Sequence, residues 1–239
     1  MAELEARFGV SSMTARRDLA ELERQGVLRR THGGAVLPAV SAHEDAFAQR
    51  VESGAQAKQA LAAAAVRLIA AGETVFLDSS STTYFVARAI IDAGLPVTLL
   101  TNSLPVMDLV TAQAGPNVDL VGVGGTLRRL TQSFVGPYAV QTVRAHFADR
   151  LFMSVKGITP DGTLTDADLL EAEVKRTMID QSAEAILLLD GSKFAVRGLH
   201  AIAPVGRLQD VIAHRAPPAD LAALRASGVT VLTTGGSTR

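Results

Sequence analysis

The 239-residue chain contains no cysteine. This excludes disulfide bonds, cysteine-based metal sites and cysteine nucleophiles. The chain also lacks a long hydrophobic segment, because its longest apolar run, 61–71, contains Arg67 and is too short to span a bilayer. The first residues are charged, and no apolar segment of a signal peptide follows them. These absences predict a soluble, cytoplasmic protein with no membrane partner.

Neither sign of charge is in excess, since 23 basic and 24 acidic residues give a net charge of −1. A protein of this charge does not coat nucleic acid, so any contact with DNA is expected in a local patch. The histidines, including His200, do not have the paired spacing of a metal site. We therefore expect neither a metal nor a cofactor.

Lysine is scarce, and the four lysines are Lys58, Lys156, Lys175 and Lys193. In a chain this rich in arginine, a retained lysine is a candidate for a tight site that needs a compact ammonium group. Retention by chance explains the four lysines equally well.

The segment 10–36 has the pattern of a recognition helix followed by a wing. Ser11 is a good N-cap, Ala15 and Leu19 recur at helical spacing, and Arg16 and Arg17 lie off that apolar stripe. Gly26 is expected to end the helix, 27–30 to form a short strand, and 33–34 a tight turn. This order predicts a winged helix-turn-helix that reads the major groove, whereas the arginines alone would fit a solvated surface helix. The residues expected to contact DNA are Ser12, Thr14, Arg16, Arg17, Arg30 and His32.

A winged domain of this type needs a further helix ahead of the helix-turn-helix, but the chain starts inside the next expected helix, 2–8. Residues 1–37 are also fewer than the ~40 residues with which a domain usually folds unaided. We therefore expect a partial winged domain in 1–37, a missing first helix, and weak DNA binding by this chain as it stands. An exposed connector with a short helix at its end is expected in 38–56.

From residue 57 onward, helical segments alternate with short strands. Helices are expected at 57–71, 82–93, 104–114, 139–147, 169–181 and 221–226, and strands at 74–77, 97–100, 118–123, 150–155, 185–189, 211–213 and 229–232. The strands are continuous apolar runs, so both of their faces should be covered. The fold class is therefore α/β, with a parallel Rossmann-like sheet in 57–239.

Polar loops follow five of these strands, where ligands of open α/β sheets bind. This set consists of hydroxyls in 78–83 and 101–103, glycines at 124–125 with Arg128 close behind, Lys156 with Gly157, and the loop 190–194. Free N–H groups and hydroxyls at a helix start can hold a phosphate, and each loop by itself could also be a plain turn or N-cap. Together the loops favour a small anionic ligand with several hydroxyl groups.

Two glutamates, Glu171 and Glu173, lie on the helix that follows 162–165. Either could accept hydrogen bonds from ligand hydroxyls. Glu171 and Lys175 are also spaced for a surface ion pair.

These motifs resemble the DeoR family of bacterial transcriptional repressors. The block 2–36 and then, in order, LDSSSTT, TNS, GGT, KGI, the EAEVK helix and LLLDGSKF are similar to that family. The resemblance implies a sensor domain with a fold like that of ribose-phosphate isomerases and glucosamine-phosphate deaminases, and a phosphorylated sugar as effector. The implied effector residues are Asp78, Ser79, Ser80, Ser81, Thr82, Thr83, Thr101, Asn102, Ser103, Gly124, Gly125, Arg128, Gly157, Glu171 or Glu173, and Lys193. Ser80 stands where the family often has glycine.

Three functions compete at this stage. The first is a repressor of carbohydrate genes that senses a sugar phosphate and binds operator half-sites as a homo-oligomer. The second is a sugar-phosphate isomerase or deaminase, for which Asp78 or Glu171 could act as general base. A CoA-transferase-like activity would need an activated glutamate and a nucleotide pocket, and neither is identifiable. The recognition helix and wing favour the regulator over an enzyme.

Overall fold

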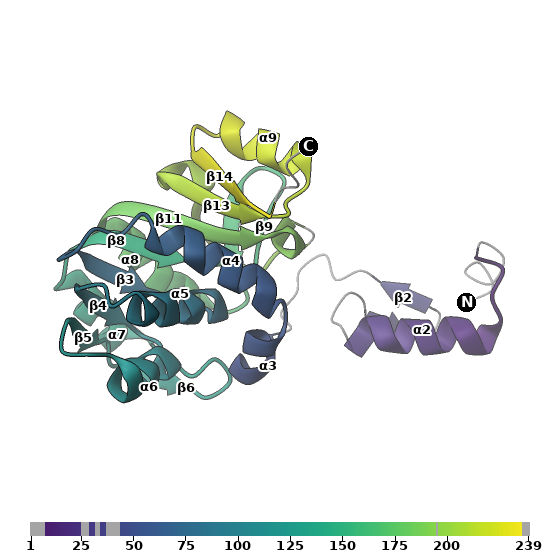
Figure 1. Cartoon of the computed structure of the whole chain (residues 1–239). Coiled ribbons are helices and arrows are strands. Elements are labelled where there is room, and N and C mark those ends of the chain that lie inside the picture. The colour runs from purple at the N-terminus through teal and green to yellow at the C-terminus, as the bar shows by residue number, and fades with distance from the viewer. Residues whose placement is uncertain (1–7, 25–28, 32–33, 37–43, 195, 236–239) are drawn as a thin grey trace. The chain divides into compact units, whose positions relative to one another are not determined.

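The computed structural model describes residues 8–24, 29–31, 34–36, 44–194 and 196–235 (Figure 1). The chain divides into two compact units, 1–43 and 44–239.

The first unit contains helix α2 (Ser12–Arg24) and an antiparallel hairpin of β1 (Arg29–Thr31) and β2 (Gly34–Val36). The predicted cap is confirmed, because the backbone N–H of Thr14 donates to Ser11 Oγ at 3.2 Å. Ala15 and Leu19 are buried, whereas Arg16 and Arg17 are exposed. The helix end at Gly26, His32 and most of the expected helix 2–8 lie outside the described residues.

The second unit is built on a sheet of seven parallel strands in the order β14-β13-β11-β8-β3-β4-β5. Its strands are β3 (Thr74–Leu77), β4 (Val97–Thr101), β5 (Val118–Gly122), β8 (Ala148–Met153), β11 (Ser182–Asp190), β13 (Asp210–His214) and β14 (Thr230–Thr234). The predicted parallel α/β sheet is confirmed.

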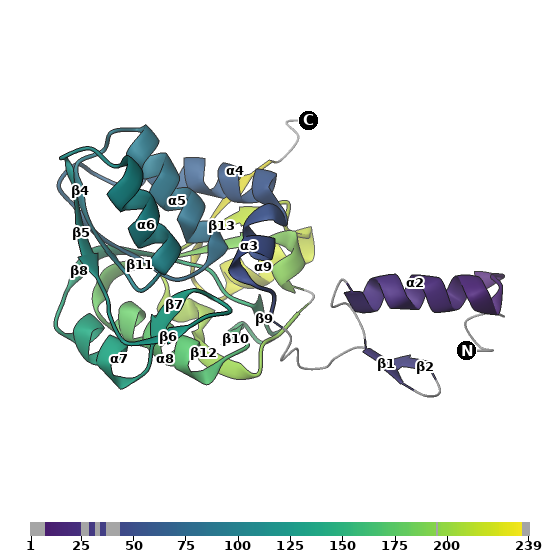
Figure 2. The ribbon, with the colours of Figure 1, turned by 90° about the horizontal axis from the view of Figure 1, so that it is seen from below.

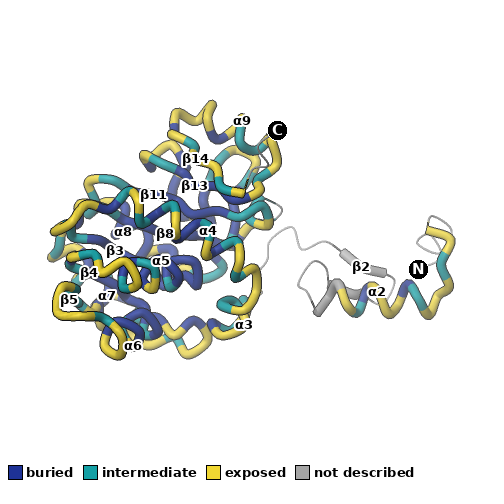
Figure 3. The backbone as a smooth tube through the Cα atoms, in the orientation of Figure 1, coloured by how far each residue is buried: buried dark blue, intermediate teal, exposed yellow. Residues whose placement is uncertain are grey.

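Helices cover both faces of this sheet, as Figures 1 and 2 show. One face carries α4 (Ala55–Val66), α5 (Ser81–Asp92) and α6 (Leu104–Gln113), and the other carries α7 (Pro137–Arg144), α8 (Leu169–Asp180) and α9 (Pro218–Ala226). Successive strand residues serve opposite cores, so that Phe76 packs with the second set of helices and Leu77 with the first. This double burial explains the continuous apolar runs of the inner strands β3, β11 and β13, which Figure 3 shows as buried. The expectation that both faces of every strand are covered is wrong for the edge strands β5 and β14, which are partly exposed.

Smaller elements that the sequence analysis did not predict lie beside α8. Strands β9 (Gly157–Ile158), β10 (Thr163–Asp166) and β12 (His200–Pro204) form an antiparallel sheet, and β6 (Thr126–Arg128) pairs with β7 (Ser133–Val135). Short 3-10 turns, η1 (Gly191–Phe194) and η2 (Val205–Arg207), follow β11 and β12. Most of these strands have only two to four residues, which is too few for a periodic signal.

The segment expected as a connector contains α3 (Phe47–Glu52), which packs into the second unit. The N–H of Phe47 donates to the Leu130 carbonyl at 2.9 Å, and its buried ring meets Tyr84 edge-on at 5.8 Å between centroids. Residues 44–56 are therefore part of the α/β unit in the structure. None of the helices in the described ranges is long and apolar enough to cross a membrane.

Candidate functional site

The polar loops predicted from the sequence meet at the carboxyl edge of the sheet. Leu77 pairs with Thr101, and Thr101 pairs with Gly122, so the residues that follow β3, β4 and β5 share that edge. β8 lies on the other side of β3, with Leu77 beside Phe152. The structure thus brings together the loops 78–83, 101–103 and 154–157.

Asp78 organises the first loop from a position where it is 1% exposed. Its Oδ1 accepts from the Ser80 N–H at 3.0 Å and from Thr83 Oγ1 at 2.9 Å, and its Oδ2 accepts from the Ser154 N–H at 3.1 Å. Both carboxylate oxygens are therefore engaged by protein donors.

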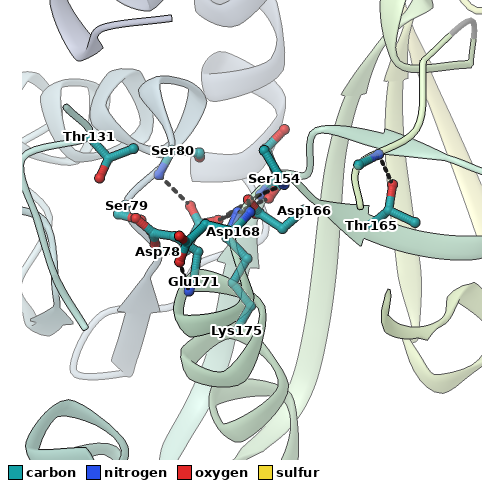
Figure 4. A network of polar contacts seen from close by, with 12 residues as sticks. Asp78, Ser79, Ser80, Thr131, Ser154, Thr165, Asp166, Asp168, Glu171 and Lys175 are labelled. Carbon is teal, nitrogen blue, oxygen red and sulfur yellow. Dashed lines mark hydrogen bonds and ion pairs between the residues drawn. The ribbon is translucent and has the colours of Figure 1, made fainter. Parts of the chain in front are cut away.

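A buried lysine, Lys175 on α8, joins this carboxylate to a second one (Figure 4). Its Nζ lies 3.2 Å from Asp78 Oδ2 and 2.8 Å from Asp166 Oδ2, and it donates to the Ser154 carbonyl at 2.8 Å. Burial alone would lower the pKa of Lys175, but the charges of Asp166 and Asp78 raise it well above its usual value. Burial would raise the pKa of Asp166, yet Lys175 holds it below its usual value. The cluster is therefore charged at neutral pH and cross-links β3, β10 and α8.

The predicted surface ion pair between Glu171 and Lys175 is wrong. Both side chains are buried, and each has other partners, because this face of α8 packs against the carboxyl edge of the sheet rather than against solvent. The spacing along the helix correctly placed both groups on one face, but it carried no information on what covers that face.

Glu171 connects the hydroxyl-rich loop 78–83 to Arg128. Its Oε2 accepts from Ser79 Oγ at 2.9 Å, and its Oε1 accepts from Ser133 Oγ and from Arg128 Nη1, the latter at 3.2 Å. Glu171 is also in the first turn of α8, which Asp168 caps by accepting from the N–H groups of residues 170 and 171.

Arg128 contacts three carboxylates. Besides Glu171, it lies 2.8 Å from Glu44 and 3.4 Å from Asp168. Burial by itself would lower the pKa of Arg128, but its hydrogen bond to Glu44 and the three negative charges raise it. Arg128, which the sequence predicted as an effector residue, thus joins three carboxylates of the second unit, and we call this arrangement the clamp. No feature of the sequence indicated its partner Glu44.

The start of α5 combines satisfied and unsatisfied groups. Ser80 is its N-cap and accepts from the Thr83 N–H at 3.2 Å, as the plain-cap interpretation of this loop required. Ser81 and Thr82 are buried, and within the described chain their N–H groups have no acceptor. This first turn therefore offers two backbone donors.

The loop after β4 leaves polar atoms unpaired. Among the described residues, Asn102 Oδ1 and Ser103 Oγ are buried without a hydrogen-bond partner. Thr101 Oγ1 accepts from the Ser103 N–H at 3.1 Å, and Asn102 Nδ2 donates to the Phe134 carbonyl at 3.0 Å. Buried unpaired atoms of this kind are uncommon in native proteins.

Two of the predicted glycines serve close packing of the backbone. A Cβ at Gly157 would lie 1.6 Å from the Val196 carbonyl oxygen, and one at Gly125, where φ is +152°, would lie 2.7 Å from the Val135 carbonyl oxygen. A Cβ at Gly124 would meet no atom within 4 Å. Packing against neighbouring strands and loops is thus sufficient to explain Gly125 and Gly157.

The site also contains two cations that the sequence analysis did not assign to it. Lys58 on α4 donates to the carbonyls of Arg50 and Ser53, the latter at 2.5 Å. Burial and the positive charges of Lys193 and Arg50 lower the pKa of Lys58 to about 8. Arg50 gave no signal in the sequence, and Lys58 stood out only as one of four lysines. No group of three potential metal ligands occurs in the described part of the chain.

Two family models match the chain. The model of the DeoR-like helix-turn-helix domain matches residues 1–40, and that of the DeoR C-terminal sensor domain matches residues 53–215. A DNA-binding unit joined to an α/β sensor defines the class, a DNA-binding transcriptional regulator. The chain belongs to the DeoR family.

Similar proteins cover nearly the whole chain. A relative in Escherichia coli O157:H7, whose name links it to the aga operon, is 35% identical over 98% of this chain and 87% of its own. The HTH-type transcriptional repressor CsqR of Escherichia coli K12 is 34% identical over 92% and 82%, and the L-fucose operon activator of Haemophilus influenzae is 32% identical over 92% and 86%. A solved ribose 5-phosphate isomerase from Methanocaldococcus jannaschii is 17% identical, with a TM-score of 0.43 over 59% of this chain and 55% of that one.

Proposed function

We propose that this regulator controls carbohydrate genes from the cytoplasm and that its second unit binds a phosphorylated sugar at the carboxyl edge of the sheet. The observation that carries the proposal is the pair of buried, unpaired atoms Asn102 Oδ1 and Ser103 Oγ. An unmade buried hydrogen bond costs about 1–3 kcal/mol. A ligand hydroxyl would supply the missing partners, and the N–H groups of Ser81 and Thr82 suit an anionic group at the start of α5.

A binding role is supported over catalysis by the state of the two carboxylates that an enzyme would use. Asp78 and Glu171 each accept hydrogen bonds at both oxygens from protein donors. A general base needs a free oxygen directed at the substrate proton. The same pairing suits a rigid frame around a ligand that is bound and released unchanged.

The exposed Arg16 and Arg17 on α2 would contact the operator, with β1 and β2 as the wing. Operators with two half-sites call for at least a homodimer. The names of relatives include both repressors and an activator, and we propose repression here.

The test is a thermal melt of the full chain with a panel of sugar phosphates and the matching unphosphorylated sugars. A ligand at one hundred times its Kd stabilises the native state by ~2.7 kcal/mol, which is about 5–10 °C for a domain of this size. We expect at least one phosphorylated sugar to shift the melt while its parent sugar does not. The same samples, assayed for product, should show no turnover. No shift with any phosphorylated sugar would refute the proposal.

A further inference from the structure

All four lysines of the chain gather in one region of the second unit. The positive charges of Lys156 and Lys175 act on Lys193 and lower its pKa, and the charge of Lys193 in turn lowers the pKa of Lys58. Arg50 acts on both Lys58 and Lys193. Burial and these like charges lower the pKa of Lys193, although Asp190 partly offsets them. We call Arg50, Lys58, Lys156 and Lys193 the cationic corner.

The cations differ in how they are balanced. Lys175 has two carboxylate partners, and Lys58 has two carbonyl partners. Within the described ranges, the ammonium groups of Lys156 and Lys193 make no hydrogen bond or ion pair. The Nε and Nη2 atoms of Arg50 are buried and have no acceptor among the described residues, while its guanidinium lies 5.6 Å from the centre of the Phe47 ring.

The corner borders the predicted ligand site. Arg50 is one helical turn beyond Phe47, whose ring contacts Tyr84 in the first turn of α5. The turn η1, which carries Lys193, lies against the residue that follows Lys156, since a Cβ at Gly157 would be 3.0 Å from the Lys193 carbonyl oxygen. The helix that carries Arg50 thus contacts the first turn of α5, and the turn that carries Lys193 packs against the residue next to Lys156.

We propose that Arg50, Lys156 and Lys193 form an anion subsite that takes the phosphate group of the effector. This inference rests on the proposed function and assigns the phosphate to this corner. A planar guanidinium can bind two phosphate oxygens at once, and the two ammonium groups supply further donors. A dianion there neutralises the repulsion among the cations and satisfies the buried nitrogens of Arg50. Because Arg50 lies on α3, binding also fixes the segment by which the chain enters this unit.

The subsite is tested with inorganic phosphate as the probe. Its affinity for the full chain is measured by calorimetry at constant ionic strength for the parent, Arg50→Gln and Lys193→Gln. Arg88→Gln, which changes an exposed arginine on α5, is the control. We expect both corner variants to bind phosphate about tenfold more weakly or worse, and the control to match the parent. Equal affinity in all four proteins overturns the proposal.

Among the described residues, the ammonium of Lys193 makes no hydrogen bond or ion pair that the substitution would break, so Lys193→Gln carries the test if Arg50→Gln fails to fold. A sugar phosphate that shifts the melts of the parent and Lys193→Gln equally leaves the proposed function intact and refutes the subsite. Loss of phosphate binding in the variants, with no sugar phosphate active on the parent, supports the subsite and refutes the proposed effector.

Discussion

The guanidinium of Arg128 lies 2.8 Å from the carboxylate of Glu44 and 3.2 Å from that of Glu171. Arg128 therefore connects Glu44, at the start of the second unit, to the buried Glu171, which accepts a hydrogen bond from the Ser79 hydroxyl.

Arg128→Gln should destabilise the second unit by about 3–5 kcal/mol, because it leaves the 2% exposed Glu171 without its counter-charge. Urea denaturation followed by circular dichroism gives the free energy of unfolding. The matched control is Arg144→Gln, since Arg144 is exposed on α7. A loss below about 1 kcal/mol, equal to that of the control, would show that the clamp adds no stability.

The Lys175 cluster predicts how stability depends on acid. The folded chain holds the pKa of Asp166 below its usual 3.8, so the unfolded chain takes up this proton first as the pH falls. The stability that the ion pair supplies is complete above about pH 4 and is lost as the pH falls through the lowered pKa.

Lys175→Met tests this dependence. At pH 7 it should lower the free energy of unfolding by about 3–5 kcal/mol, because Asp78 and Asp166 become unpaired buried charges. The deficit relative to the parent should shrink below pH 4, where protonation removes the unpaired charge of Asp166 in the variant. Lys156→Met, which removes a lysine without a carboxylate partner among the described residues, should cost far less. A deficit that stays constant down to pH 2 would contradict this account.

The sequence predicted the sheet better than the site, for a physical reason. Strands β3 and β4 contain the apolar runs VFL and LL because helices cover both faces of the sheet, and this local pattern is visible in the sequence alone. Strand β10 reads Thr163–Asp166, and its order depends on pairing with β12 far along the chain. Such pairing has no local signature.

The same limit applied to the site. Loops at strand ends were recognisable, so Asp78 and Asn102 were placed correctly at one edge. The partners of Lys175 and Arg128 come from distant segments, and only the fold brings them together. The four lysines lie in one region, and whether they mark a ligand site stays a prediction.

Replacing Arg16 or Arg17 by alanine should weaken operator binding, since both side chains are exposed on the capped helix α2. A lost contact to a base edge costs ~1–3 kcal/mol and relaxes specificity, whereas a lost phosphate contact lowers the salt slope by about one. Fluorescence anisotropy at several salt concentrations distinguishes the two. Arg88→Ala, in the other unit, should leave the affinity unchanged. Operator affinity that survives both α2 substitutions would exclude α2 as the recognition helix.

Anion binding at the cationic corner should weaken as the pH rises through about 8, the pKa of Lys58. The groups that act on Lys58 are Lys193 and Arg50, which lower its pKa after burial does, and Asp190, which raises it. Sulfate is the suitable probe because it remains a dianion throughout, so any change in affinity comes from the protein. Between about pH 7 and pH 9.5 we expect the affinity to fall roughly tenfold as a nearby positive charge is lost.

Sulfate also favours the protonated lysine, so calorimetry near pH 8 in buffers of different ionisation enthalpy should show proton uptake on binding. Lys58→Gln should bind sulfate weakly with a flatter pH profile, and a parent profile as flat as that of the variant would rule out titration of Lys58 in the corner.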